Sequence, residues 1–308
     1  MARSEFRIIA DLFAPLARTP AALGLKDDVA LIAPRKGHEL VLTTDAIVAG
    51  VDFFANDPPD TIARKALRVN LSDLAAKGAE PFGYLLTLAL PKTVTQSWLK
   101  AFARGLAQDQ RTFRIALLGG DLSGTPGPLT VSVTAFGHVP KGKAILRRGA
   151  RPGDLVFVSG TIGDSGAGLA ALLAKKRSPF IARYRVPEPR TRLGPKLRGL
   201  ATAALDVSDG LIADLAHIAD QSQVHIAVEA ARVPRGSKLS PAEAATAGDD
   251  YEIAFTAPRA RRAKVLAAAK AARTPVTEIG FVMPGRGIAL LDSAGKPIPL
   301  KRTGYRHF

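Results

Sequence analysis

The chain has 308 residues, 47% of them apolar and 23% charged, which is typical of a soluble globular protein large enough for two domains. It contains no cysteine, which excludes disulfides, thiolate metal sites and cysteine nucleophiles and indicates a reducing compartment, the cytoplasm. The net charge of +16 indicates either polyanionic partners or a basic solvated surface, but aromatic residues make up only 6%, so we expect no nucleic-acid partner.

The first half of the chain alternates strand-like apolar runs with segments of helical spacing. The predicted strands, each bounded by Gly, Pro or Asp, are 28–32, 40–43, 83–90, 115–118, 129–136 and 154–159. Helices are predicted over 61–77, with Asp60 as N-cap and Gly78 as its stop, and then over 96–110 and 166–173. No apolar run approaches the roughly 18 residues that span a bilayer, so we expect no membrane segment.

A turn-rich stretch over 140–153 precedes a second half with the same alternation. Its predicted strands are 224–229 and 251–256, and its predicted helices are 211–222 and 259–272. The segment 178–195 is rich in proline and arginine and is predicted to be an irregular crossing loop. We therefore predict two α+β domains, over 1–142 and 143–308.

Aspartate recurs where a predicted strand runs into a turn of small residues. This happens at Asp45, at Asp121 and over 206–210, and acidic doublets at 27–28 and 249–250 flank further strands. Strand ends of one sheet converge at one edge, where two carboxylates about 4 Å apart repel by about 4 kcal/mol at an effective dielectric of about 20. We therefore expect bound divalent cations, and the all-oxygen ligand set without an EF-hand loop favours Mg²⁺. The alternative for any single aspartate is a turn-former or a helix N-cap.

Two further segments carry polar groups with two interpretations each. On the helix predicted over 61–77, Asn70, Asp73 and Lys77 share a face and form either part of a site or a structural network. The glycine-rich turn 159–168 opens a predicted helix and either cradles a phosphate or serves tight packing. Neither a Walker-type lysine motif nor a GxSxG elbow is present, so we predict catalysis by positioning and metal ions, with no side-chain nucleophile.

Seven sequence blocks together resemble the thiamine-monophosphate kinase family. In chain order they are DDVAL, TTD, VNLSDLAAKGA, LGGD, RRGARPGD, DVSDGL and GDDYE. The resemblance covers nearly the whole chain, and the blocks over 70–79 and 208–210 are its most specific parts. It implies the two-domain α+β fold of the aminoimidazole-ribonucleotide synthetase-related proteins. In that fold the N-terminal domain dimerises through its sheet and the C-terminal α+β domain completes the ATP site.

The resemblance also implies an activity and the residues that carry it. The implied reaction is ATP-dependent phosphorylation of thiamine monophosphate to thiamine diphosphate, by direct in-line transfer assisted by several Mg²⁺ ions in a homodimer. The implied metal ligands are Asp28, Thr43, Thr44, Asp45, Asp73, Asp121, Asp206 and Asp209. The implied ATP contacts are Gly120, Asp121, Arg147 and Ser208, and the implied substrate contacts are Asp52, Asp249 and Arg302.

The chain departs from the family pattern at four positions. Lys26 stands where the family has glycine, Asp52 replaces a histidine, Asp249 replaces a glutamate, and Arg302 lies near the place of a tryptophan. Asp52 either meets the cationic thiazolium ring or faces water. The absence of cysteine argues against the related selenophosphate synthetases and hydrogenase-maturation proteins. Aminoimidazole-ribonucleotide synthetase, a basic nucleic-acid-binding protein and a structural metal-binding protein remain as alternatives.

Overall fold

A computed structural model describes residues 5–305 of the chain. The chain divides into two compact units, the first made of the residues up to 142 apart from the segment 75–79, which groups with the second. This segment includes the end of α2 (Pro59–Ala76). Lys77 of the segment donates its ammonium to the carbonyl of Ala204 at 2.8 Å, and its own carbonyl accepts the N–H of Ile145 at 3.1 Å. These bonds tie the segment to the second unit.

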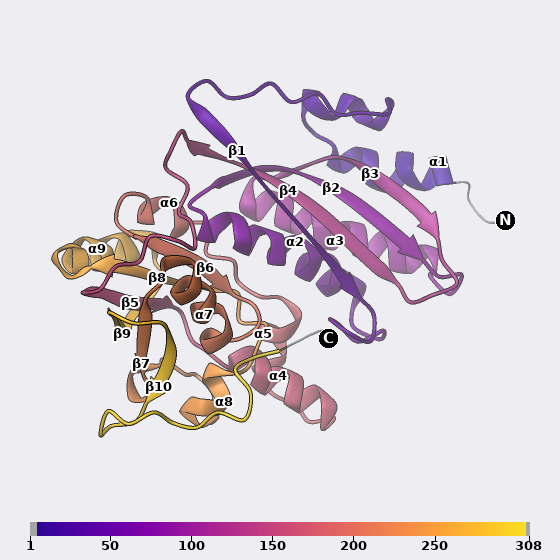
Figure 1. The fold of residues 1–308 in the computed structure, drawn as a ribbon. Coiled ribbons are helices and arrows are strands. Elements are labelled where there is room, and N and C mark those ends of the chain that lie inside the picture. The colour runs from indigo at the N-terminus through magenta and orange to yellow at the C-terminus, as the bar shows by residue number, and fades with distance from the viewer. Residues whose placement is uncertain (1–4, 306–308) are drawn as a thin grey trace. The chain divides into compact units, whose positions relative to one another are not determined.

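The first unit is built on a four-stranded sheet. The strand order is β1 (His38–Val48), β4 (Thr130–Pro140), β2 (Glu80–Leu90), β3 (Ala116–Gly124). The pairs β1/β4 and β4/β2 are antiparallel, whereas β2 and β3 are parallel and are joined through α3 (Gln96–Phe113). Figure 1 shows α2 and α3 on the same face of this sheet, and Val131 and Val133 of β4 are fully buried. Leu40 and Leu42 of the outer strand β1 remain 40% and 57% exposed.

Residues 5–25 form short helical pieces before the first strand. They are α1 (Glu5–Ile8), η1 (Ile9–Phe13), η2 (Ala14–Leu16) and η3 (Pro20–Leu25), and η3 contacts β3. Residues 26–37 then reach β1 without forming a strand, so the strand predicted over 28–32 is wrong. Its apolar residues Val29 and Leu31 are 55% and 64% exposed, so no packing holds the segment in a sheet.

The second unit is built on a six-stranded sheet. The strand order is β10 (Gly287–Leu291), β7 (His225–Glu229), β9 (Val276–Met283), β5 (Asp154–Ser159), β8 (Glu252–Pro258), β6 (Ala203–Val207). Only β10 and β7 pair in parallel, and the other neighbours are antiparallel. The helices are α4 (Asp164–Leu173), α5 (Ile181–Arg185), α6 (Gly194–Leu197), α7 (Leu211–Ser222), α8 (Pro241–Ala245) and α9 (Arg262–Ala272), with short 3₁₀ turns at η4 (Ala230–Arg232) and η5 (Arg259–Arg261).

Two hydrophobic clusters form the core of the second unit. One contains Val156 and Val158 of β5 together with Leu215 of α7. The other contains Phe157 of β5, stacked on Phe255 of β8 with ring centroids 5.2 Å apart. Because neighbouring residues of a strand point to opposite faces, β5 is buried on both sides and anchors the sheet.

The structure confirms most predicted elements and corrects two interpretations. Asp45 and Asp121 lie inside β1 and β3, so the prediction that each ends a strand-to-turn segment is wrong for both. The prediction for 206–210 is confirmed, because β6 ends at Val207 and runs into the turn 208–210. At Gly120 the strand continues because its backbone pairs with Leu86, and a Cβ would lie 1.8 Å from the Leu86 carbonyl oxygen. The segment 178–195 contains α5 and the start of α6, so it is not wholly irregular.

Two caps were predicted for the helix over 61–77. Asp60 lies within the first turn of α2, because the helix already begins at Pro59. Gly78 follows the end of the helix with φ of +71°, which confirms it as the stop. Across residues 5–305, none of the helices is both long enough and apolar enough to cross a membrane.

Candidate functional site

In the first unit, β1 places two predicted metal ligands against α2. The hydroxyl of Thr43 donates to Oδ2 of Asp73 at 2.5 Å. Asn70 is fully buried one turn earlier on α2, and its Oδ1 accepts the backbone N–H of Asp45 at 3.0 Å. Its amide nitrogen donates to the carbonyl of Ala66 at 3.0 Å. Asn70 and Asp73 therefore form a bonded network that fixes β1 relative to α2.

Thr44 takes no part in this network through its side chain. Its hydroxyl donates to the carbonyl of Val133 at 3.2 Å and accepts from the hydroxyl of Thr134 at 3.1 Å. Successive side chains on a strand point to opposite faces. Thr43 and Asp45 therefore face α2, and the Thr44 hydroxyl lies on the other side of the sheet.

The carboxyl group of Asp45 is influenced by the negative charges of two neighbouring aspartates. Desolvation by burial, together with the negative charges of Asp73 and Asp52, raises the pKa of Asp45 to about 6. A nearby cation would favour the ionised form and reverse this shift. Oxygen donors of this kind are the ligands that Mg²⁺ prefers, so the residues present fit that ion. Within residues 5–305, no three His, Asp or Glu side chains already enclose a metal position, so water or phosphate oxygens would have to complete the coordination.

Asp52 lies beside this group but is tied into the turn after β1. Its Oδ2 accepts the backbone N–H of Val48 at 2.8 Å, and its carbonyl accepts the ammonium of the buried Lys65 at 2.7 Å. The carboxylate therefore holds the turn as well as adding negative charge near Asp45. Its contact with a substrate stays a prediction.

The remaining predicted residues of the first unit lie apart from this group. Asp28 is exposed in the segment that precedes β1, and its N–H is bonded to Oδ1 of Asp27 at 2.8 Å. Gly120 and Asp121 lie on β3, the outer strand on the side of the sheet opposite to β1. The structure therefore brings together Thr43, Asp45 and Asp73 and leaves Asp28 and Asp121 separate.

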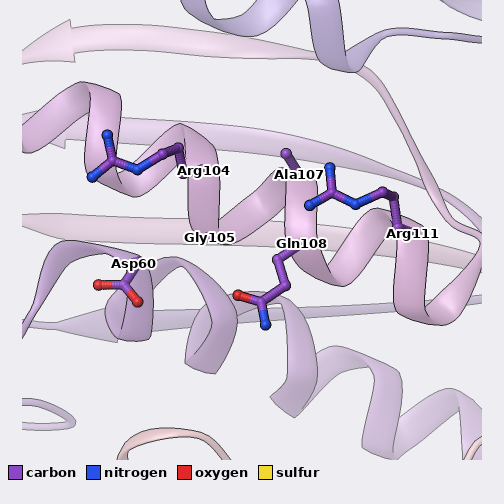
Figure 2. A pocket seen from close by; sticks show the side chains of 6 residues that line it. All are labelled: Asp60, Arg104, Gly105, Ala107, Gln108 and Arg111. Atoms are coloured by element: carbon purple, nitrogen blue, oxygen red, sulfur yellow. The ribbon is translucent and has the colours of Figure 1, made fainter.

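A pocket in the first unit lies between α2 and α3, away from the predicted residues. Figure 2 shows its lining by Asp60, Arg104, Gly105, Ala107, Gln108 and Arg111. Gly105 permits the close helix contact there, because a Cβ would lie 2.4 Å from the carbonyl oxygen of Asp60. The pocket contains no predicted ligand.

In the second unit, β6 leads into the loop 208–210, which carries two predicted ligands. Asp206 is buried on the strand, whereas Ser208 and Asp209 lie in the turn before α7. The backbone N–H groups of all three loop residues donate to Oδ2 of Asp214 at 3.0 Å. Burial, and then the charge of Asp209, raises the pKa of Asp214 to about 7, although these three N–H groups act in the opposite direction.

The predicted substrate residue Asp249 lies directly behind this loop. Its backbone N–H donates to the carbonyl of Ser208 at 2.7 Å, and the N–H of Tyr251 donates to that of Val207 at 2.7 Å. Asp249 and Tyr251 have φ of +66° and +52°, a left-handed conformation that is uncommon outside glycine and is concentrated at functional sites. The hydroxyl of Tyr251 bonds to Oδ1 of Asp249 at 3.1 Å and orients that carboxylate.

Arg147 and Arg302 are both exposed, so solvent reaches the two predicted cationic contacts. The carbonyl of Arg147 accepts the hydroxyl of Ser222 at 3.3 Å. That contact holds the backbone and leaves the orientation of the guanidinium unspecified. Solvent and salt would screen the positive charges of Arg147 and Arg302 unless a ligand covers them.

The glycine-rich turn 159–168 is closed by the chain's own carboxylates. The N–H groups of Gly163 and Ser165, at the start of α4, donate to Asp250 at 2.6 Å and 3.2 Å. Burial raises the pKa of Asp250 well above its usual range. Glycine is needed at 168 because a Cβ would lie 2.2 Å from the carbonyl oxygen of Phe180. Of the two interpretations of this turn, tight packing is the one the structure shows.

Three functional features were missed by the sequence analysis. Asp214, Tyr251 and the buried Glu252 all hold predicted residues or their neighbours in place. The carboxylate of Glu252 accepts hydrogen bonds from the guanidinium groups of Arg183 at 2.9 Å and Arg190 at 2.6 Å, both in the segment 178–195. For Asp214 the sequence carried a signal, because it is an acidic residue in the first turn of the helix predicted over 211–222. A carboxylate at that position commonly accepts hydrogen bonds from free N–H groups.

Comparison with known proteins decides the family. The N-terminal domain of AIR synthase related proteins matches residues 26–139, and the C-terminal domain matches residues 151–293. A thiamine-monophosphate kinase of Caulobacter vibrioides is 45% identical over 99% of this chain and 91% of its own length. The chain belongs to the thiamine-monophosphate kinase family. The predicted family and the two-domain α+β fold class are thereby confirmed.

Solved structures of the thiamine-monophosphate kinase family share the fold closely. The enzyme of Stenotrophomonas maltophilia K279a superposes with a TM-score of 0.84 at 38% identity, covering 95% of this chain and 96% of that one. AaThiL complexed with AMPPCP and TMP gives a TM-score of 0.78 at 30% identity, covering all of this chain and 99% of that one. The similarity therefore extends through both units.

Proposed function

We propose that this chain phosphorylates thiamine monophosphate with ATP and releases thiamine diphosphate and ADP. The observation that carries the proposal is its 30% identity, over the full chain, to AaThiL with bound AMPPCP and TMP. The acidic residues of β1 and α2 are oxygen donors that would hold the divalent cations such a reaction needs. The absence of cysteine is consistent with a cytoplasmic enzyme.

The chemistry needs no side-chain nucleophile. The acceptor phosphate is already largely dianionic near neutral pH, because the second pKa of a phosphate monoester is about 6. The obstacle is the approach of two polyanions in line, so catalysis consists of positioning and charge neutralisation. We propose direct in-line transfer of the γ-phosphoryl group.

The residues that would hold Mg²⁺ are the eight ligands that the family resemblance implies. They are Asp28, Thr43, Thr44, Asp45, Asp73, Asp121, Asp206 and Asp209. Bound Mg²⁺ supplies charge neutralisation for the phosphate oxygens. Asn70 holds the backbone of Asp45 and Thr43 holds the carboxylate of Asp73, so the backbone of one ligand and the carboxylate of another are fixed before any ligand binds.

The remaining residues would bind the two substrates. We assign Gly120, Asp121, Arg147 and Ser208 to ATP, where Arg147 would balance phosphate charge. We assign Asp52, Asp249 and Arg302 to thiamine monophosphate. The bond from Tyr251 to Asp249 supports this assignment, because it holds the carboxyl group of Asp249 in a left-handed backbone turn.

We further propose that the active form is a homodimer. Exposed Leu40 and Leu42 on the outer strand β1 form an apolar stretch that a single copy leaves in water. An unpaired edge strand of this kind readily pairs with another chain. A second copy covering this sheet would bury these leucines.

The test is to incubate the purified protein with ATP, Mg²⁺ and thiamine monophosphate and to quantify ADP and thiamine diphosphate by chromatography. Asp121→Ala is the site variant, and Asp220→Ala, an exposed aspartate on α7, is the matched control. We expect equal amounts of both products from the protein and the control, and loss of both in Asp121→Ala. ADP formation with a different phosphorylated acceptor, but not with thiamine monophosphate, would reject thiamine monophosphate as the acceptor substrate.

A further inference from the structure

Three successive backbone N–H groups converge on a single oxygen atom in the second unit. The N–H groups of Ser208, Asp209 and Gly210 each lie 3.0 Å from Oδ2 of Asp214. Asp214 is 3% exposed and lies in the first turn of α7. Successive N–H groups that point to one place ordinarily form an anion-binding concavity. Here the carboxylate of the chain itself occupies that place.

The carbonyl groups of the same loop are bonded as well. The carbonyl of Ser208 accepts the N–H of Asp249 at 2.7 Å, and the carbonyl of Asp209 accepts the N–H of Tyr305 at 2.9 Å. The carbonyl of Gly210 accepts the N–H of Asp214 at 2.9 Å. Every backbone polar group of the loop therefore has a partner within the chain.

The side chains of this loop are the groups left to meet a ligand. In the part of the chain that the structure describes, neither the Ser208 hydroxyl nor the Asp209 carboxylate makes a hydrogen bond. The loop thus combines a fully bonded backbone with free oxygen donors. Such an arrangement is expected where ligands must be held in place before a cation binds.

We propose that Asp214 is a positioning residue that fixes the loop 208–210 so that Asp209 and Ser208 point toward the metal ion and ATP. This inference rests on the proposed function, because it concerns the same site. Removing the carboxylate leaves three N–H groups without their acceptor, so the loop must rearrange or recruit water. The loss falls first on the ligands that Asp209 and Ser208 hold.

A similar arrangement of N–H groups around a carboxylate occurs at the start of α4. The carboxylate of Asp250 accepts hydrogen bonds from the N–H groups of Gly163 and Ser165 there, in a turn that carries none of the predicted ligands. With both concavities filled by carboxylates, neither is open to a phosphate. Any contact of the second unit with the phosphates of ATP would therefore come from side chains and cations and not from these N–H groups.

The test compares Asp214→Ala and Asp214→Asn with Asp220→Ala, which removes an exposed carboxylate from the same helix. Three quantities are measured on the full chain. They are amide hydrogen exchange at 208–210, binding of Mn²⁺ without nucleotide by electron paramagnetic resonance, and the kinetics of the kinase reaction.

For Asp214→Ala we expect faster exchange at 208–210 and about tenfold weaker Mn²⁺ binding, the usual effect of removing a group that orients a metal ligand. The KM for ATP should rise and kcat should fall, with a smaller rise in the KM for thiamine monophosphate, because Asp249 is bonded to the carbonyl of Ser208. Asp214→Asn keeps an acceptor oxygen without the charge, so its values should lie between those of the alanine variant and the unmodified protein.

Exchange and Mn²⁺ binding in Asp214→Ala that equal those of Asp220→Ala would overturn the proposal, even if the melting temperature falls. If Asp214→Ala does not fold, Asp214→Asn decides: faster exchange with weaker Mn²⁺ binding supports the proposal, and values equal to those of the unmodified protein reject it. Failure of the proposed function is distinguishable, because the unmodified protein would then convert no thiamine monophosphate while both binding measurements still report on the loop.

Discussion

Asp45 and Asp121 lie on the two outer strands of one four-stranded sheet, with β4 and β2 between them. Neighbouring strands are about 4.8 Å apart, so three intervals separate the two strands by about 14 Å. Mg²⁺ holds its oxygen ligands at about 2.0–2.1 Å, which two aspartate side chains cannot reach across that gap. Within one copy, these two residues therefore cannot hold the same ion.

The proposed homodimer predicts that Asp45 of one copy works with Asp121 of the other. Asp45→Ala and Asp121→Ala should each be inactive alone, but a mixed dimer would contain one intact pair. After co-expression, we expect activity to return to about a quarter of the unmodified rate, because random mixing makes half of the dimers hybrid and each hybrid has one working site of two. A mixture as inactive as its components would show that each copy works alone.

The raised pKa of Asp45 predicts a pH dependence of metal binding. Below a pKa of about 6 the carboxyl is mostly protonated and is a poor ligand, so protons and Mg²⁺ compete. The Mg²⁺ concentration for half-maximal activity should therefore rise as the pH falls from 7.5 to 5.5 and level off above about 7. In Asp45→Asn we expect weaker binding with little of this pH dependence, and an unchanged pH profile in that variant would assign the effect to another group.

Tyr251 should affect one substrate only. Tyr251→Phe removes the hydroxyl that bonds to Asp249 at 3.1 Å, which costs about 1 kcal/mol and should raise the KM for thiamine monophosphate roughly threefold to tenfold. The KM for ATP should not change. Added to Asp249→Ala, the same substitution should have no further effect, whereas additive losses would separate the two residues.

Glu252 should contribute more to the free energy of unfolding than Glu278, which also has two arginine partners. It is fully buried between Arg183 and Arg190, so Glu252→Gln leaves poorly compensated charge and should lower the free energy of unfolding by roughly 3 kcal/mol in urea titrations. Glu278 is the matched control, because its partners Arg232 and Arg262 are about half exposed. Glu278→Gln should cost less than about 1 kcal/mol. Equal losses in the two variants would contradict this account.

The sequence predicted the strands and helices best where burial enforces them. The buried strand β5 and helix α7 begin and end at the predicted residues, because apolar periodicity and flanking turn residues coincide there. Residues 28–32 had a similar pattern but lack a neighbouring strand, which local sequence cannot reveal. Asp45 and Asp121 were assigned to turns because small residues surround them, whereas pairing with β4 and β2 continues both strands through these residues.

The candidate site residues were predicted from family motifs, but the contacts that hold them were not. The three N–H groups that meet Asp214 depend on how the loop folds back onto α7. The bond between Thr43 and Asp73 joins residues 30 positions apart in the chain. Such contacts arise from tertiary packing, for which spacing along the sequence carries no signal.

We propose that the γ-phosphoryl group passes directly from ATP to thiamine monophosphate, without a covalent enzyme intermediate. The most direct measurement is the stereochemical course of transfer, with ATP made chiral at the γ-phosphorus by oxygen isotopes. A single in-line displacement predicts inversion of configuration in thiamine diphosphate. Retention would require two displacements through a phosphorylated side chain and would contradict the account.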